Sequence, residues 1–367
     1  MINIIFAALL SIFLNSPPRM EEIEKHVPLK ASVEPTLKVI DTNNRQTVID
    51  FYNNSYLNLF IIPAGWTGEV PSCNAGNVYS FYNLSTVQTI NYFRVMCGLP
   101  ELFLDNFYTQ KCQESSLIMF ANNILTHQPT NDLLCWTAFG AEAAASSNIG
   151  WGGGPVGVLS CMNEGVYGNY EVGHRRWFLF PPSISVGSGS VYESYYNGVN
   201  TIWVLTPFGI RPSLPEFVSW PSKGYVPYPV VFAKWSFSLK GANFSQSSVK
   251  MKKIGGSSIS LVRYPLAYGY GDPTIVWLPS LAFNQGMSDK TYEVTIKDVN
   301  VGGQIKNYIY RVTVIDPGPA PVFTPYLTPT PSLSVSPSPS TTPSLTLTIS
   351  KTPTQVPNYS IGWEWYE

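Results

Sequence analysis

The spacing of apolar residues changes part-way along the chain. Between residues 85 and 125, apolar side chains recur at steps of three and four residues, which is typical of one face of a helix. Between residues 220 and 316 they form short runs with no helical pattern between them, and the last run alternates as in a half-buried strand. A helical bundle is therefore excluded. The many aromatic, Pro and Gly residues favour short strands and loops around aromatic cores.

The apolar pattern in the first half of the sequence predicts helices and strands that share one core. We expect helices over residues 85–97, 108–125 and 155–164, and strands over residues 184–190 and 201–206. Gly98 and Pro100 end the first helix, because Gly is favoured just after a helix and Pro cannot continue it. The fold class predicted here is α/β, in a region of roughly 130 residues.

Residues 220–316 predict an all-β domain. Six strands are expected over residues 230–239, 248–254, 259–263, 274–278, 291–299 and 308–315. Successive short strands without intervening helices are typical of a β-sandwich of the immunoglobulin-like type. The Pro-containing residues 220–229 predict a linker in front of this sandwich, and residues 21–75 predict an irregular N-terminal extension.

Both ends of the chain indicate secretion. Residues 4–14 are apolar but too few to span a bilayer, which fits the hydrophobic part of a signal peptide over residues 1–18. No later apolar run reaches the roughly 18 residues of a membrane helix. Between residues 324 and 357, 24 of 34 residues are Pro, Ser or Thr, so residues 319–367 predict a disordered stalk at a cell surface. Sequons for N-glycosylation occur at Asn53, Asn83, Asn243 and Asn358.

Charge and cysteine content narrow the classes of function. The chain has 22 Lys and Arg against 23 Asp and Glu, a net charge of −1, and no basic block stands out. Nucleic acid is therefore not an expected partner. The five cysteines all lie in the first half and include no Cys-x-x-Cys pair, which argues against a structural zinc or redox motif. They allow up to two disulfides, whose pairing the sequence leaves open, and buried free thiols are the alternative.

Only three histidines occur, and two have distinctive neighbours. His127 lies in Leu-Thr-His-Gln-Pro-Thr and His174 in Val-Gly-His-Arg-Arg-Trp, with the acidic Glu164 between them. Two neutral imidazoles, a carboxylate and a water would suit Zn²⁺. The histidines are 47 residues apart, so only the fold can bring them together. Arg175 and Arg176 are expected to be surface charges beside a core aromatic residue.

Six short fragments follow one another in a characteristic order: Ile90-Asn91-x-x-Arg94, Gly98-Leu99-Pro100, Leu125-Thr126-His127, Ser147-Asn148-Ile149-Gly150-Trp151, Met162-Asn163-Glu164 and Gly173-His174-Arg175-Arg176-Trp177. Their order and spacing resemble the CAP superfamily of secreted proteins, also called the SCP or sperm-coating-protein domain. The last fragment looks most like the bacterial-style branch, which often carries a β-sandwich after the domain. The resemblance implies an α-β-α sandwich over residues 76–212 and an immunoglobulin-like sandwich over residues 213–318.

The resemblance also implies a site. In the CAP superfamily two histidines and two acidic residues meet in a central cleft, and some members bind zinc or another divalent ion there. His127, His174 and Glu164 match three of these positions, and we expect them to be the metal ligands. Ser147 stands where the other acid would be, and Glu142, five residues earlier, does not match.

The leading hypothesis for function is an extracellular binding module, whose ligand is a lipid or sterol, a glycan, or a protein on a host or cell surface. The rival is a hydrolase in which Ser147, His174 and Glu164 act as nucleophile, base and orienting acid, or in which a metal-bound water attacks. The absence of a Gly-x-Ser-x-Gly elbow argues against the triad. A third hypothesis is a structural cell-surface adhesin that binds partners through the β-sandwich.

Overall fold

The structure is a computed structural model that describes residues 38–165, 168–193 and 197–320. The predicted signal peptide, the sequon at Asn358 and all but the first two residues of the predicted stalk lie outside these ranges. Within them, no helix has both the length and the apolar character needed to cross a membrane.

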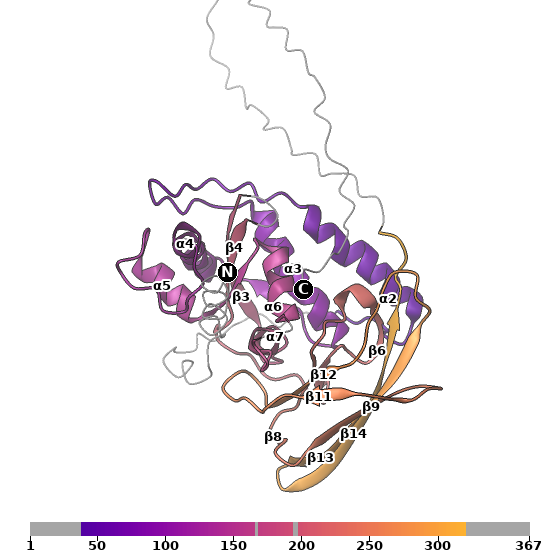
Figure 1. Cartoon of the computed structure of the whole chain (residues 1–367). Helices are drawn as coiled ribbons and strands as arrows, with labels where there is room; N and C mark the ends of the chain where they lie inside the picture. Colours follow the sequence, from indigo (N-terminus) through magenta and orange to yellow (C-terminus); the bar gives the residue numbers. More distant parts are fainter. Residues whose placement is uncertain (1–37, 166–167, 194–196, 321–367) are drawn as a thin grey trace, which may run out of the picture. The chain divides into compact units, whose positions relative to one another are not determined.

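A four-stranded sheet forms the centre of the first half of the chain (Figure 1). Its order is β1-β3-β4-β2; β1 runs parallel to β3, and the other neighbours pair antiparallel. The strands are β1 (Phe103–Leu104), β2 (Ser147–Trp151), β3 (Ser185–Tyr192) and β4 (Gly198–Trp203). The two strands predicted from the sequence, over residues 184–190 and 201–206, are confirmed as β3 and β4.

Helices cover both faces of this sheet (Figure 1). The four are α3 (Ser80–Met96), α4 (Asn106–Asn122), α5 (Ala138–Ala145) and α6 (Pro155–Asn163). α4 and α5 lie on one side and α3 and α6 on the other, which makes three layers. The predicted helices are thus confirmed as α3, α4 and α6, and the mixed α/β fold class with them.

Glycines in β3 let α4 approach the sheet closely. A Cβ on Gly189 would lie 2.2 Å from the backbone of Cys112 and Gln113, and one on Gly187 would lie 2.5 Å from Tyr108. Real side chains do not pack at such distances, so only Gly fits where α4 crosses these positions. The same helix is capped by Asp105, whose carboxylate accepts the amide of Phe107 at 2.9 Å.

Residues 45–61 are helical, and the predicted irregular extension over residues 21–75 is wrong there. α2 (Arg45–Phe51) continues into a π-helical turn and a 3-10 turn that ends at Ile61. The Asn44 side chain caps α2 by accepting the Thr47 amide at 3.1 Å. Phe51 and Tyr56 pack on Tyr92 of α3, with ring centroids 5.1 and 4.3 Å apart. Aromatic packing against α3 therefore stabilises a segment whose own helical pattern is weak.

Two sheets packed around aromatic side chains make up the second half (Figure 1). One has the order β11-β12-β7-β5, with β5 (Val218–Trp220), β7 (Trp235–Ser238), β11 (Leu261–Arg263) and β12 (Thr274–Pro279). The other has the order β10-β9-β13-β14-β6, with β8 also on β13; its strands are β6 (Gly224–Pro227), β8 (Ala242–Asn243), β9 (Ser248–Lys253), β10 (Ser258–Ile259), β13 (Lys290–Val301) and β14 (Gln304–Ile315).

This arrangement is sandwich-like and contains all six predicted strands, with two differences. The strand expected over residues 259–263 is divided: β10 pairs with β9 in one sheet, and β11 pairs with β12 in the other. The linker expected over residues 220–229 is wrong, because these residues include the end of β5 and all of β6. Pro is tolerated here because β5 and β6 are edge strands.

One disulfide is present among the five cysteines. It joins Cys73 to Cys135, across 62 residues, and ties the loop after α4 to the segment before α3. Cys97, Cys112 and Cys161 are free thiols. Both alternatives that the sequence left open are therefore present, as one disulfide and three free thiols.

Candidate functional site

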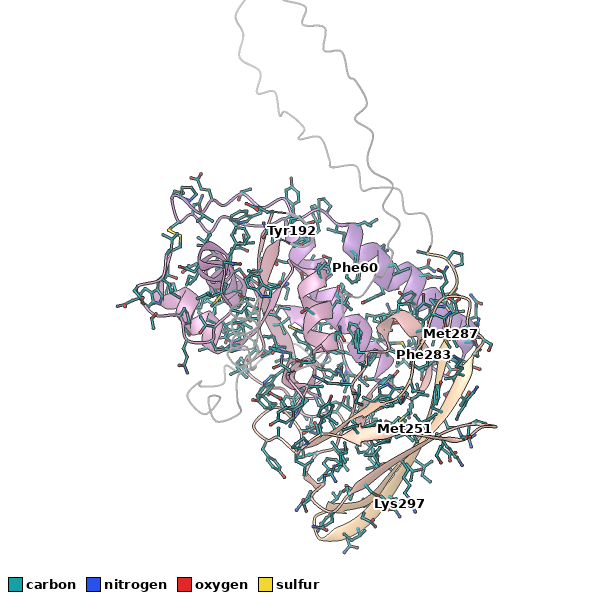
Figure 2. All side chains as sticks on the ribbon, in the orientation of Figure 1. Phe60, Tyr192, Met251, Phe283, Met287 and Lys297 are labelled. Carbon is teal, nitrogen blue, oxygen red and sulfur yellow. A yellow bond between two sulfur atoms is a disulfide. The ribbon has the colours of Figure 1, made fainter. Side chains whose placement is uncertain are left out.

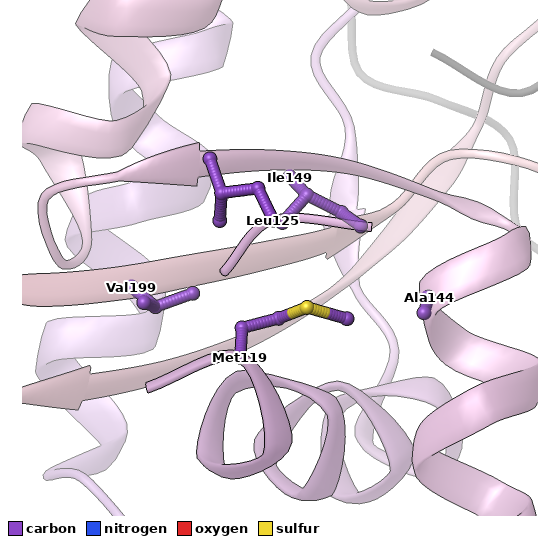
Figure 3. Packing of buried hydrophobic residues seen from close by; sticks show 5 residues of the cluster. All are labelled: Met119, Leu125, Ala144, Ile149 and Val199. Carbon is purple, nitrogen blue, oxygen red and sulfur yellow. The ribbon is translucent and has the colours of Figure 1, made fainter. Parts of the chain in front are cut away.

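His127 is held by the end of α4 and the packing beneath it. Leu125 packs with Met119, Ala144, Ile149 and Val199 in a buried cluster between the helices and the sheet (Figure 3). Two residues later, His127 Nδ1 lies 2.7 Å from the carbonyl oxygen of Ala144. That contact fixes the ring with its proton on Nδ1. His127 Nε2 is buried and has no hydrogen-bond partner among the described residues.

His174 is held by a carboxylate. It lies on α7 (Gly173–Phe178), and its Nδ1 is 2.8 Å from Glu164 Oε2. The other carboxylate oxygen, Oε1, accepts the amide of Arg175 at 3.1 Å. Glu164 ends α6 in a left-handed conformation, with φ of 62°, and both side chains are buried. His174 Nε2, like that of His127, is buried without a partner in the described part of the chain.

Electrostatics favour a neutral His127. Burial is the main reason that its pKa falls to about 4; the Ala144 carbonyl opposes the change, and a charge on His174 adds to it. Burial by itself would raise the pKa of Glu164, but His174 and the Arg175 amide hold it below its ordinary value. Glu164 is therefore a carboxylate at neutral pH.

The residues available to a metal are two imidazoles. In metal sites, a histidine binds through one ring nitrogen while the other donates to a carboxylate or a backbone carbonyl. His127 and His174 have this arrangement, with Nδ1 engaged and Nε2 free to bind. Glu164 uses both oxygens behind His174, so its position is that of an orienting group and differs from the predicted ligand. Within residues 38–165, 168–193 and 197–320, no group of three or more His, Cys, Asp and Glu is arranged to hold a metal.

Ser147 does not form the hydrogen bond that a catalytic triad requires. It is buried on β2, and its hydroxyl lies 4.0 Å from the thiol of Cys112. His174 makes its ring contact to Glu164 through Nδ1, and its Nε2 is without a partner, so neither nitrogen bonds Ser147. The next residue, Asn148, points to the other face of the sheet and donates to the His174 carbonyl at 3.0 Å.

Arg175 and Arg176 are buried, and the expectation of surface charges is wrong. Arg175 donates to the Met162 carbonyl and to that of Lys234, each at 2.8 Å. Arg176 donates to the carbonyls of Ala267 and Asp272, at 3.0 and 2.9 Å. Both guanidinium groups therefore join α7 to the β-sheet half of the chain. A five-donor guanidinium can satisfy several buried carbonyls at once, which explains why it is tolerated there.

Lys234 is a site-forming residue that sequence analysis missed. It precedes β7 and is fully buried. Its ammonium donates to the carbonyls of Glu164, Gly168 and Asn169, in the loop between Glu164 and His174. Burial lowers the pKa of Lys234 to about 8, against the opposing charge of Glu164. The available signal was a lone cation inside the apolar run Val-Val-Phe-Ala-Lys-Trp, since unpaired lysines are rarely buried.

Comparisons with known proteins do not assign a family. No family model matches the chain, and no curated protein matches it. Among solved structures, the copper resistance protein PcoC of Escherichia coli is similar over 28% of this chain and 100% of its own, with 18% identity and a TM-score of 0.22. A TM-score this low supports no conclusion about fold or function.

Proposed function

We propose that this protein is a secreted, CAP-like binding module in which His127 and His174 hold a divalent metal ion through their Nε2 atoms. The proposal rests on one observation, which is that the two imidazole rings have the same hydrogen-bonding pattern. Each Nδ1 is fixed by an oxygen, and each Nε2 is buried without a partner. A buried polar nitrogen without a partner costs free energy, and a bound cation would supply the missing contact.

The groups that contact the two imidazole rings each have a part in this site. The Ala144 carbonyl and Glu164 orient the two imidazoles, and Glu164 also gives His174 a negative partner, which strengthens the ring as a donor. Two protein ligands leave further positions of a divalent ion for oxygen atoms of water or of a ligand. Zn²⁺ suits imidazole nitrogen, and when bound it would supply a Lewis-acidic contact for an oxygen of an extracellular ligand.

Binding is favoured over catalysis. The Ser147–His174 hydrogen bond on which the nucleophilic alternative depends is replaced by a Cys112 contact. Hydrolysis by a metal-bound water is the alternative function if the metal binds. The proposed ligand is a lipid, a glycan or a protein on a surface. The CAP character of the first half and the immunoglobulin-like type of the second belong to the same proposal.

A titration of Zn²⁺ by calorimetry into the full, chelator-stripped chain tests the metal site. The third histidine provides a matched control: His127→Ala and His174→Ala should abolish one-to-one binding, whereas His26→Ala should leave it unchanged. The full chain is needed because Arg175 and Lys234 connect the site to the β-sheet half. Equal binding by the wild type and the His127→Ala variant would overturn the proposal. Turnover of ester or peptide substrates only by the zinc-loaded wild type would favour the hydrolase instead.

A further inference from the structure

The outer face of the six-stranded sheet carries most of its charge as cations. Alternate residues of β13 and β14 point into the core, where Tyr292, Val294 and Val312 are buried. The residues between them, with alternate residues of β9 and β6, face outward. We define the basic sheet face as the five exposed cations and the one carboxylate found there: Lys223, Lys250, Lys252, Lys297, Arg311 and Glu293.

These cations come together through strand register. Lys252 pairs with Glu293, and Glu293 with Arg311, so the three form a row across β9, β13 and β14. Glu293 bonds both neighbours, at 2.8 and 3.0 Å, and cannot neutralise two cations. Lys250 and Lys297 lie further along the same face, and Figure 2 shows Lys297 on the long β13–β14 hairpin. Asp298 lies in the β-bulge beyond it, and Lys306 pairs there with the inward-facing Val299.

The face is also hollowed and rich in hydroxyl groups. A groove of about 740 Å³ lies on the side of the face next to β6, and its lining includes Lys223, Arg311 and Glu293. Thr291 and Thr313, opposite each other on β13 and β14, line the same groove, as does Tyr225 of β6. Hydroxyls between exposed cations offer hydrogen bonds to sugar hydroxyls beside contacts to acidic groups.

We infer that the basic sheet face binds an acidic polysaccharide, with sulfate or carboxylate groups against the cations and sugar hydroxyls in the groove. The charges of the face complement those of such a ligand, because five cations and one carboxylate gather on one face of a chain whose net charge is −1. Such a concentration attracts a polyanion and holds it by several weak contacts at once. The inference does not depend on the histidine site, which lies on other elements.

Other polyanions fit the face less well. Single-stranded nucleic acid is held by exposed aromatic rings on which bases stack. Between the cations of this face lie Thr295 and the aliphatic Ile309, which is 64% exposed. The aromatic side chains at the groove are half-buried (Phe217 and Tyr225) or buried (Tyr310), so they offer little open ring surface for stacking. A membrane surface would need apolar side chains that insert, and the face has few. Both remain defined outcomes of the test below.

The test measures binding of the full chain to immobilised dextran sulfate, with neutral dextran as the matched probe, by surface plasmon resonance. Lys250→Glu with Lys297→Glu removes cations from the face without touching Glu293. Lys240→Glu with Lys253→Glu changes the net charge by the same amount on exposed lysines that lie outside the face. We expect the first pair of substitutions to raise the dissociation constant for dextran sulfate at least tenfold, and the control pair to raise it less than twofold. Raising the salt concentration should weaken wild-type binding, because exposed charges are screened.

Several outcomes would overturn the inference. The inference is wrong if the wild-type protein does not bind dextran sulfate, or if it binds neutral dextran with the same affinity. It is also wrong if both pairs of variants lose the same amount of affinity for dextran sulfate. Tighter binding to single-stranded DNA or to phosphatidylserine vesicles at matched charge would assign the face to another polyanion. If the first pair unfolds, Lys223→Gln with Lys252→Gln is compared with the wild type in its place.

Discussion

The central sheet and the six-stranded sheet differ in how many of their faces are covered. Nearly every residue of β3 and β4 is buried, because helices lie on both sides. In β13 and β14 the buried residues alternate with exposed ones, because only one side is covered. A doubly covered sheet must accommodate its neighbours at every position, whereas a singly covered sheet leaves half its side chains available for binding.

Gly189 gives the largest expected difference between the two sheets. Gly189→Val should destabilise the protein by more than about 3 kcal/mol, because its side chain would overlap the backbone of α4 at Cys112. Thr295→Val, on the open face of β13, should change the free energy of unfolding by less than about 0.5 kcal/mol. Chemical denaturation measures both. Similar losses from the two substitutions would show that the close approach of α4 is not needed.

Replacing one buried and one exposed lysine compares how much each kind of surface contributes to stability. Lys234→Met leaves three buried carbonyls without their donor and should cost about 2–3 kcal/mol of stability. Lys223→Met, on the exposed basic sheet face, should cost less than about 0.5 kcal/mol. Thermal unfolding at pH 7 separates them. A Lys234→Met protein as stable as the wild type would contradict the structural part assigned to this ammonium group.

Buried His127 predicts a dependence of stability on pH in metal-free protein. Its pKa is about 4 when folded and near 6.5 when unfolded, so the unfolded state binds more protons between these values. The contribution of His127 to stability should therefore be constant above pH 6.5 and fall by about 2 kcal/mol as the pH drops towards 4, a figure reduced because the side chain keeps partial exposure. His127→Gln should remove this part of the slope. Parallel curves for the variant and the wild type would contradict the assignment.

The sequons test accessibility without a large effect on stability. Asn243 is exposed, and its side chain accepts the amide of Ser245 at 2.9 Å, whereas Asn83 is buried within α3. After secretion from a eukaryotic host, mass spectrometry of glycosidase-treated peptides should find a glycan at Asn243 and none at Asn83. Occupancy at Asn83 would mean that α3 forms later than glycan transfer. An unmodified Asn243 in secreted protein would contradict the exposure of this turn.

The sequence predicted those elements whose pattern is local. The three- and four-residue spacing before Cys97 and around Met119 predicted α3 and α4, and the alternation after Tyr308 predicted β14. β2 was missed, because a strand buried on both faces, such as Ser147–Trp151, does not alternate. α2 was missed because its stability comes from contacts with Tyr92, far along the chain.

The site could be predicted only in part. The sequence singled out His127, His174 and Glu164, but not that Glu164 would lie behind His174, since that depends on the left-handed turn that ends α6. Burial of Arg175 depends on the second half of the chain, which supplies its acceptor at Lys234. The basic sheet face could not be predicted either, because its cations lie on separate strands. Only the register of the strands brings them together.

Anomalous scattering at the zinc edge, from crystals of the full chain grown with Zn²⁺, tests the central claim most directly. If the two imidazoles hold the ion, one strong peak lies about 2.0–2.1 Å from both His127 Nε2 and His174 Nε2, with Glu164 still bonded to His174 Nδ1. A peak bound instead to the Glu164 carboxylate would restore the sequence-based ligand set. Zinc found elsewhere, with both Nε2 atoms unchanged, would contradict a metal site at the two histidines.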